Sequence, residues 1–261
     1  MKMLNDEQFK KMYKELHLIN DDDTFIQLHR SCKNRNQCWQ NAEDRIPADG
    51  DEWGVSRPWI GRYYDKLRLH IIGINMNEYA GYNGIIKCVN IAIDELNQNI
   101  KKNLVSPTYG GTNVFSRIGT CAAIFAEKEK LMNPNWVYST LPGKEIANGF
   151  DFIAYNNHIK CAPIDNDSKP TNEMWDECGK YILRGEIEFI NPKTILLFGI
   201  SENFKNFNNN ILDEKIELNR CKEISSGIGR IAGREIKIYV VPHPRVLSDE
   251  SIDDLYNLVK Q

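Results

Sequence analysis

The stretch NNHIKCAPIDNDSKPTNEMWDECGKYILRGEIEFINPKTILLFG, residues 156–199, decides the fold. An apolar, β-prone segment, 152–155, precedes it, and its middle is polar and rich in turn residues. From Thr171 onward, apolar residues recur at the 3–4 spacing of one buried helix face, interrupted only by Glu186. An Asn-Pro pair ends that helix, and residues 194–198 form a continuous apolar run, typical of a strand buried on both faces. We therefore predict a strand–helix–strand crossover whose loop carries function.

The rest of the chain shows the same alternation of strands and helices. The strands are expected at 69–74, 151–155, 194–199 and 236–241. This order predicts an α/β fold with three layers, α/β/α, around a central, mainly parallel, four-stranded sheet. Residues 5–30 are predicted to form two short helices that brace the domain.

Length and composition limit the class of protein. With 261 residues, 41% of them apolar, we expect a single domain, residues 1–261, with a helical, cysteine-containing extension over 1–66 and insertions near 83–112 and 203–234. The net charge of −3 argues against a uniformly basic surface but leaves room for a local basic groove. No apolar run reaches the length of a membrane span or signal core, so a cytoplasmic location is expected. The protein is also expected to be a monomer. The seven cysteines are then core residues, metal ligands or reactive thiols rather than disulfides.

Polar loops follow three of the predicted strands. The first reads GINMNEY from Gly73, the second NNHIKCAP from Asn156, and the third PHPR from Pro242. Together they resemble the loops of the uracil-DNA glycosylase superfamily, whose first strand ends in a GxDPY, GINPG or GMNPG loop and whose last ends in HPS. The central pattern, KCAP, PTNE, a cysteine, YIL, EI, INPK and an apolar strand ending in FG, is similar to the iron–sulfur branch. The resemblance covers about 69–82 and 110–247.

The resemblance implies a catalytic pair and a set of residues that read the base. Asn75 matches the residue that positions the attacking water, although the iron–sulfur branch usually has Ala there. His243 matches the histidine that donates to the pyrimidine O2 as negative charge builds. Asn157 matches the asparagine that pairs with the flipped base, and its amide offers one acceptor and two donors. Residues expected to stack on the base or to line its site are Phe115, with Tyr79 and Tyr82 as rivals, and Gly73.

Each of these residues also has a structural interpretation. Asn75 could simply turn the chain after a strand, and His243 could be a turn or core histidine. Asn157 could satisfy backbone groups at a strand end, and Phe115 could be an ordinary core residue. We favour the functional interpretation for Asn75, His243 and Asn157 and leave both interpretations open for Phe115.

The same loops supply candidate DNA contacts. Arg245 replaces the serine of the HPS motif and, with Val246 and Leu247, could hold a phosphate and fill the space left by a flipped base. Lys160 and Arg117 are the other basic residues expected to face the same side of the site as His243.

Four cysteines are implied as cluster ligands. Cys161 and Cys178 fall where the iron–sulfur branch has two ligands. Cys32 and Cys38 lie in a long irregular segment, which in a compact domain is usually functional or held in place by a bound group. Their C-x5-C spacing differs from the usual C-x-x-C. A 4Fe-4S cluster is expected, with zinc on the same thiolates as its rival.

The resemblance implies a monofunctional DNA glycosylase that hydrolyses the N-glycosidic bond of a flipped uracil or modified pyrimidine. Base excision repair and defence against phage with modified DNA are the two expected settings. Because Met-Asn replaces the compact Pro-Tyr or Pro-Gly after Asn75, the pocket is expected to accept a larger, modified pyrimidine. Two alternatives remain open: a catalytically inactive DNA-binding relative, and an α/β enzyme that acts on free nucleotides.

Overall fold

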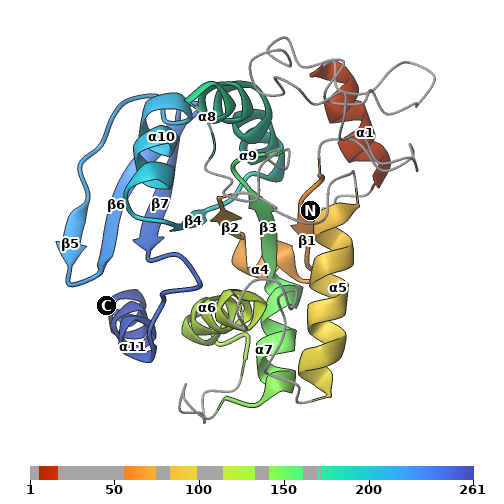
Figure 1. Ribbon diagram of the computed structural model, residues 1–261, viewed down its shortest axis with the longest axis vertical. Helices are drawn as coiled ribbons and strands as arrows, with labels where there is room; N and C mark the ends of the chain where they lie inside the picture. Colours follow the sequence, from red (N-terminus) through yellow and green to blue (C-terminus); the bar gives the residue numbers. More distant parts are fainter. Residues whose placement is uncertain are drawn as a thin grey trace.

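A computed structural model describes residues 6–16, 56–74, 83–98, 114–132, 141–160, 170 and 172–261. Within these residues the strands form one sheet in the order β1-β3-β2-β4-β7-β6-β5 (Figure 1). Neighbouring strands are parallel for the pairs β3-β2, β2-β4 and β4-β7. They are antiparallel for β1-β3, β7-β6 and β6-β5. The strand bounds are β1 Trp59–Ile60, β2 Leu69–Gly73, β3 Ile153–Asn157, β4 Thr194–Phe198, β5 Asn219–Cys221, β6 Ile224–Ile231 and β7 Arg234–Val241.

The predicted α/β class is confirmed, but the sheet is mixed and has seven strands in the described residues, not four. Two of the additional strands, β5 and β6, lie in the segment 203–234 that was expected to be an insertion. Antiparallel pairing of β6 with β7 is made by a tight turn in which Ala232 and Gly233 both have positive φ, 50° and 72°. Such turns usually carry Asn-Gly or Asp-Gly, so the Ala-Gly pair gave no hairpin signal.

Helices pack on both faces of the sheet. Their bounds are α1 Asp6–Glu15, α4 Tyr64–Leu67, α5 Gly84–Asn97, α6 Val114–Lys128, α7 Gly143–Gly149, α8 Asn172–Glu177, α9 Arg184–Ile190, α10 Glu202–Asn210 and α11 Asp249–Lys260. A π-helical segment, Cys178–Leu183, joins α8 to α9, and a 3₁₀ turn, Phe150–Phe152, precedes β3. No helix in the described residues is long and apolar enough to cross a membrane.

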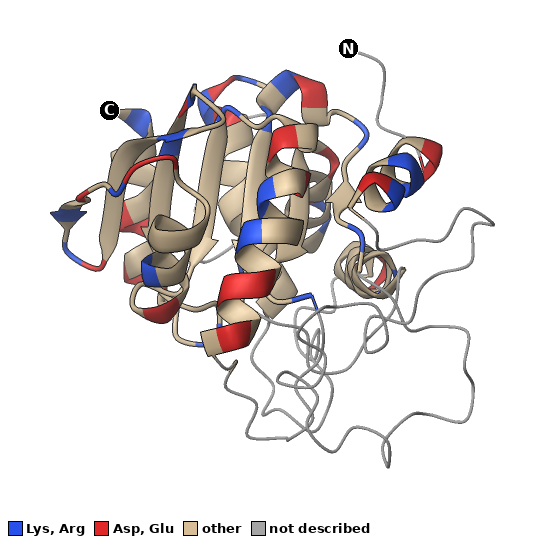
Figure 2. Cartoon of the chain, turned by 90° about the horizontal axis from the view of Figure 1, so that it is seen from above, with Lys and Arg blue, Asp and Glu red and all other residues tan. Residues whose placement is uncertain are grey.

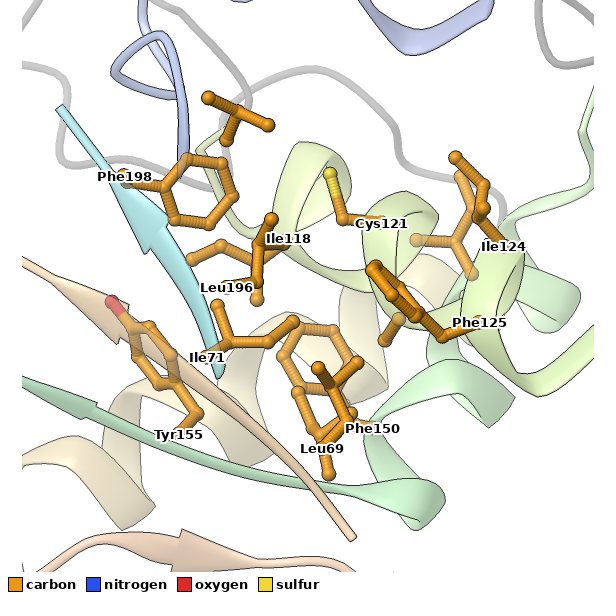
Figure 3. Packing of buried hydrophobic residues seen from close by; sticks show 14 of the residues in the cluster. Leu69, Ile71, Ile118, Cys121, Ile124, Phe125, Phe150, Tyr155, Leu196 and Phe198 are labelled. Carbon is orange, nitrogen blue, oxygen red and sulfur yellow. The ribbon is translucent and has the colours of Figure 1, made fainter. Parts of the chain in front are cut away.

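Alternate residues of the central strands divide the core between the two faces. In β4, Leu196 and Phe198 join a cluster with residues of α5, α6, α7 and α11, and Figure 3 shows them facing Ile118 of α6. Ile195 and Leu197 lie in a second cluster with residues of α9 and α10. The strand is therefore buried on both faces, as its apolar run predicts.

The first strand of the crossover lies two residues later than predicted. Asp151 and Phe152 belong to the 3₁₀ turn, so β3 runs over Ile153–Asn157. This shift places Asn156 and Asn157, expected at the start of a loop, inside a fully buried strand. The helix after it forms as predicted, and Asn191, in the left-handed conformation with φ 55°, ends it.

The first N-terminal helix is present as α1. Phe9, Met12 and Tyr13 of α1 pack against Ala154 of β3 and Ile182 of the π-helical segment. The second predicted helix of this region lies outside the described residues.

Candidate functional site

The carboxyl ends of four parallel strands meet at one edge of the sheet. Backbone pairing continues beyond β2 and β3, since His158 N–H donates to Gly73 O at 3.1 Å and Ile159 N–H to Ile74 O at 2.9 Å. On the other side, Gly199 N–H donates to Val241 O at 2.8 Å. Ligands of open α/β sheets bind at this edge, and the loops that follow Gly73, Asn157 and Val241 all begin there.

The carboxamide of Asn157 lies directly across Gly73. The two residues are register partners in the β2-β3 pair. A Cβ on residue 73 would come within 2.2 Å of Asn157 Oδ1, so any other residue there would displace this carboxamide from its position. Asn157 is buried, and its Oδ1 accepts a hydrogen bond of 3.4 Å from the hydroxyl of Tyr155.

Phe115 reaches the same place from the first turn of α6. Its ring meets the ring of Tyr155 edge-on, with 6.0 Å between the centroids and an interplanar angle of 77°. Phe115 is half-buried, whereas Tyr155 is buried. Gly73, Phe115 and Asn157, three of the residues expected at the site, are therefore gathered around Tyr155. We call these four residues the Tyr155 cluster.

His243 follows β7 by two residues and has a defined tautomer. The backbone N–H of Arg245 donates to its Nδ1 at 3.2 Å, so in the neutral ring the proton resides on Nε2. Burial, with a smaller contribution from the charge of Arg245, lowers the pKa of His243 below its ordinary value. A neutral imidazole with an Nε2–H donor is the form that hydrogen-bonds to a carbonyl oxygen without first giving up a proton.

Asn203 fastens the strand ends together. Its Nδ2 donates to the carbonyl of Phe198 at 2.7 Å and to that of Gly73 at 3.3 Å. Its Oδ1 accepts from Nδ1 of buried His158 at 2.8 Å. One side chain thus links the ends of β2, β3 and β4, and it holds the residue adjacent to Asn157.

The sequence analysis missed Tyr155, His158 and Asn203. Tyr155 lies two residues before Asn157, and period-2 spacing along a strand would have placed both side chains on one face. His158 and Asn203 carry no comparable signal, because their contact joins residues 45 positions apart.

Lys160 does not face the mouth of the site, and its predicted contact with DNA is not supported by this position. The side chain is buried and pairs with Glu186, which is fully buried. Glu186 also accepts hydrogen bonds of 2.5 Å from Tyr13 of α1 and from Nδ2 of Asn156. Burial lowers the pKa of Lys160 and raises that of Glu186, and each charge opposes the shift of the other. These buried partners explain why a glutamate, Glu186, interrupts the apolar face of the helix.

The remaining residues that were expected to contact DNA differ in how exposed their side chains are. Arg245 and Val246 are exposed, Val246 by 69%, and both can meet a ligand. Leu247 is buried in the core cluster on the α6 and α11 side, so it does not fill the space left by a flipped base. Arg117 forms an ion pair of 2.5 Å with Asp249 at the start of α11. Basic and acidic side chains are interspersed over the described helices (Figure 2).

Six predicted site residues lie outside the described residues: Asn75, Tyr79, Tyr82, Cys32, Cys38 and Cys161. The fourth predicted ligand, Cys178, begins the π-helical segment and is buried with Ile159, Met174 and Trp175. Ile159 precedes Cys161 by two positions, so Cys178 lies beside the chain segment that leads to a second cysteine. Among the described residues alone, no group of three or more potential ligands is found.

The chain matches no known protein-family model, and no curated protein is significantly similar to it.

Proposed function

We propose that this protein is a monofunctional DNA glycosylase with a uracil-DNA glycosylase-like fold, whose parallel core is the four strands β3, β2, β4 and β7. Its substrate is a uracil or modified pyrimidine flipped out of DNA, and its product is an abasic site. A cytoplasmic role in base excision or in defence against phage DNA is consistent with this activity.

The observation that carries the proposal is the Tyr155 cluster. Gly73, Phe115 and Asn157 come from elements far apart in the sequence, and the resemblance implies a base-binding role for each of them. Their convergence supplies what a flipped base requires, namely an aromatic ring for its face and a carboxamide for its hydrogen-bonding edge.

The chemistry follows from where charge develops. Cleavage of the glycosidic bond leaves negative charge on the base and positive charge on the sugar. The Nε2–H of His243 donates to the base oxygen as that charge builds, and its fixed tautomer means that no reorganisation is needed at that moment. Asn75 positions the water that attacks the anomeric carbon. This role rests on the sequence motif alone.

We further propose that Cys32, Cys38, Cys161 and Cys178 hold a 4Fe-4S cluster, with zinc as the alternative. The burial of Cys178 beside the segment leading to Cys161 supports the second half of this set. The group would tie the N-terminal segment to the core and would take no part in the glycosidic chemistry. Iron, sulfide and zinc analysis of anaerobically purified protein tests it: four irons per chain support the cluster, zinc supports the alternative, and neither metal contradicts both.

The activity is tested with oligonucleotides, single- and double-stranded, that carry uracil, hypoxanthine, 5-hydroxymethyluracil, 5-hydroxymethylcytosine or its glucosylated form, followed by alkaline cleavage. We expect cleavage at a pyrimidine and its loss, on the order of 100-fold or more, in His243→Ala, since such a donor contributes that much to catalysis. Gly73→Ala should also lose activity, because its Cβ displaces the Asn157 carboxamide.

Lys222→Ala is the control, since Lys222 pairs with Asp254 on the surface and belongs to no part of the proposed site. It should retain full activity. No cleavage of any base would contradict the proposal, with retained DNA binding favouring an inactive DNA-binding relative. Cleavage that persists in both His243→Ala and Gly73→Ala would show that the chemistry occurs elsewhere.

A further inference from the structure

The pairing of the parallel strands has a gap between the ends of β2 and β4. Pairing of β2 with β3 continues to Gly73, and pairing of β4 with β7 continues to Phe198. The register between β2 and β4 ends one residue earlier on each strand, at Ile72 and Leu197. The chain passes from β2 to β3 on one side and then to β4 on the other, so the strand order reverses at this gap. Ligands of open α/β sheets bind at such a point.

Asn203, near the start of α10, spans the gap. Its Nδ2 donates to Phe198 O at 2.7 Å and to Gly73 O at 3.3 Å. Because carbonyl oxygens only accept, the amide nitrogen must face them, and both of its N–H groups are used. Its Oδ1 accepts from Nδ1 of His158 at 2.8 Å. The side chain is fully buried, and these contacts hold its carboxamide in one orientation.

We propose that Asn203 is a positioning residue for glycosidic cleavage, which sets the distance between the part of the site that binds the base and the loop that carries His243. This inference rests on the proposed function and adds to it a residue that lies outside the three strand-end motifs.

The two sides of the gap carry different parts of the proposed chemistry. Gly73, with its partner strand β3, lies on one side and contributes to the Tyr155 cluster. The other side leads to His243, because Gly199 N–H donates to Val241 O, two residues before that histidine. Asn203 therefore joins the groups that hold the base to the strand end that presents the donor.

The separation of the two sides matters more for the rate than for binding. A hydrogen-bond donor stabilises the charge that develops on the base oxygen only at about 2.7–3.1 Å. A misplacement of about 1 Å is enough to cost on the order of 100-fold in rate. The contacts that hold the base lie on the β2 side, where the β2-β3 pairing remains when Asn203 is replaced.

The experiment replaces Asn203 by leucine, which has a similar volume but no donor. Single-turnover cleavage is measured on duplexes that carry uracil, 5-hydroxymethyluracil or 5-hydroxymethylcytosine. Affinity is measured on the same duplexes with the 2′-fluoroarabino sugar, which resists cleavage. We expect the rate of Asn203→Leu, per folded molecule, to fall at least about tenfold, while the dissociation constant stays within about threefold of wild type.

A double mutant tests whether Asn203 acts through His243. In His243→Ala the donor is absent, so we expect the further change Asn203→Leu to cost no additional rate. Independent roles would instead give additive losses.

Asn208→Leu is the matched control. Asn208 also lies on α10 and also makes two hydrogen bonds to backbone groups, to Ile216 O at 3.0 Å and from Ile216 N–H at 2.9 Å, in the segment before β5. Its rate should equal that of wild type. Asn203→Ser keeps one donor and should be intermediate, and it replaces the leucine variant if that variant does not fold.

Three results would overturn the inference without bearing on the activity itself: an unchanged rate in Asn203→Leu, equal losses of rate and affinity, or additive losses with His243→Ala. Failure of both Asn203 variants to fold would also overturn it, since the contact would then serve the fold alone. A wild type that cleaves none of these bases would refute the proposed activity, and the inference with it.

Discussion

At the strand ends, hydrogen bonds from backbone groups determine the orientation and protonation of single side chains. His243 illustrates this, because the backbone N–H of Arg245 binds Nδ1 and so decides which ring nitrogen carries the proton. Protonation of Nδ1 would break that bond, since the nitrogen would become a donor facing a donor. The hydrogen bond within the loop therefore stabilises the neutral form of the His243 ring.

The pH dependence of base release should report this residue. Burial and the charge of Arg245 lower the pKa of His243, so the neutral form persists below the ordinary histidine value of about 6.5. We expect the single-turnover rate to stay constant from pH 8 down through about 6.5 and to fall only at lower pH. Rates measured between pH 4.5 and 8, with DNA affinity measured in parallel as the control, test this. A rate already halved above pH 6.5 would contradict it.

Elements of the crossover are joined by a buried polar network rather than by apolar contacts alone. Glu186 of α9 binds Tyr13 of α1, Asn156 of β3 and Lys160 just beyond β3. His70 of β2 completes the network, with its Nε2 2.9 Å from Asn156 Oδ1. Because Lys160 follows Asn157 by three residues, this network holds the end of the strand that contributes Tyr155 and Asn157 to the Tyr155 cluster.

Removal of one charge from this network should destabilise the protein strongly. Lys160→Met leaves Glu186 buried without its cation, and we expect a loss of about 3–5 kcal/mol in the free energy of unfolding. Lys160→Met/Glu186→Gln should recover part of that loss, because no net charge then remains buried. Urea denaturation measures both.

Lys180→Met is the matched control, since Lys180 forms an exposed pair with Asp176, and exposed pairs of this kind contribute at most about 1 kcal/mol. Similar losses for Lys160→Met and Lys180→Met would show that the network contributes nothing special.

At the scale of the whole molecule, two fully buried histidines make stability depend on acidity. Burial lowers the pKa of His70 to about 3, and it does the same for His158. In the unfolded chain both titrate near the ordinary value of about 6.5. Between these values the unfolded chain binds more protons than the folded one, so acid favours unfolding.

The contribution of these two histidines to the free energy of unfolding should therefore be complete above pH 6.5. It should fall as the pH drops toward 3. The two histidines together give a slope of up to about 2.7 kcal/mol per pH unit, in addition to any contribution from other groups. Urea unfolding at pH 7, 6 and 5 measures it. His158→Gln should show a shallower slope by about one proton, and a slope identical to that of wild type would contradict the assignment.

The sequence by itself determined the features that depend on local pattern. Period-2 and period-3.6 repeats of apolar residues fixed the α/β class, the crossover and the doubly buried strand β4. Motifs at strand ends placed Gly73, Asn157 and His243 at one edge, because the carboxyl ends of parallel strands necessarily meet there. These features follow from residues close together in the chain.

Only the tertiary structure decided which residues touch across long sequence separations. It added β1, β5 and β6 to the sheet, buried Lys160 against Glu186, and placed Leu247 in the core while leaving Val246 exposed. It also brought Tyr155 and Phe115 together and let Asn203 tie three strand ends. The physical reason is that burial and pairing are properties of packed neighbours, and the same lysine or leucine is solvated or buried according to what lies opposite it.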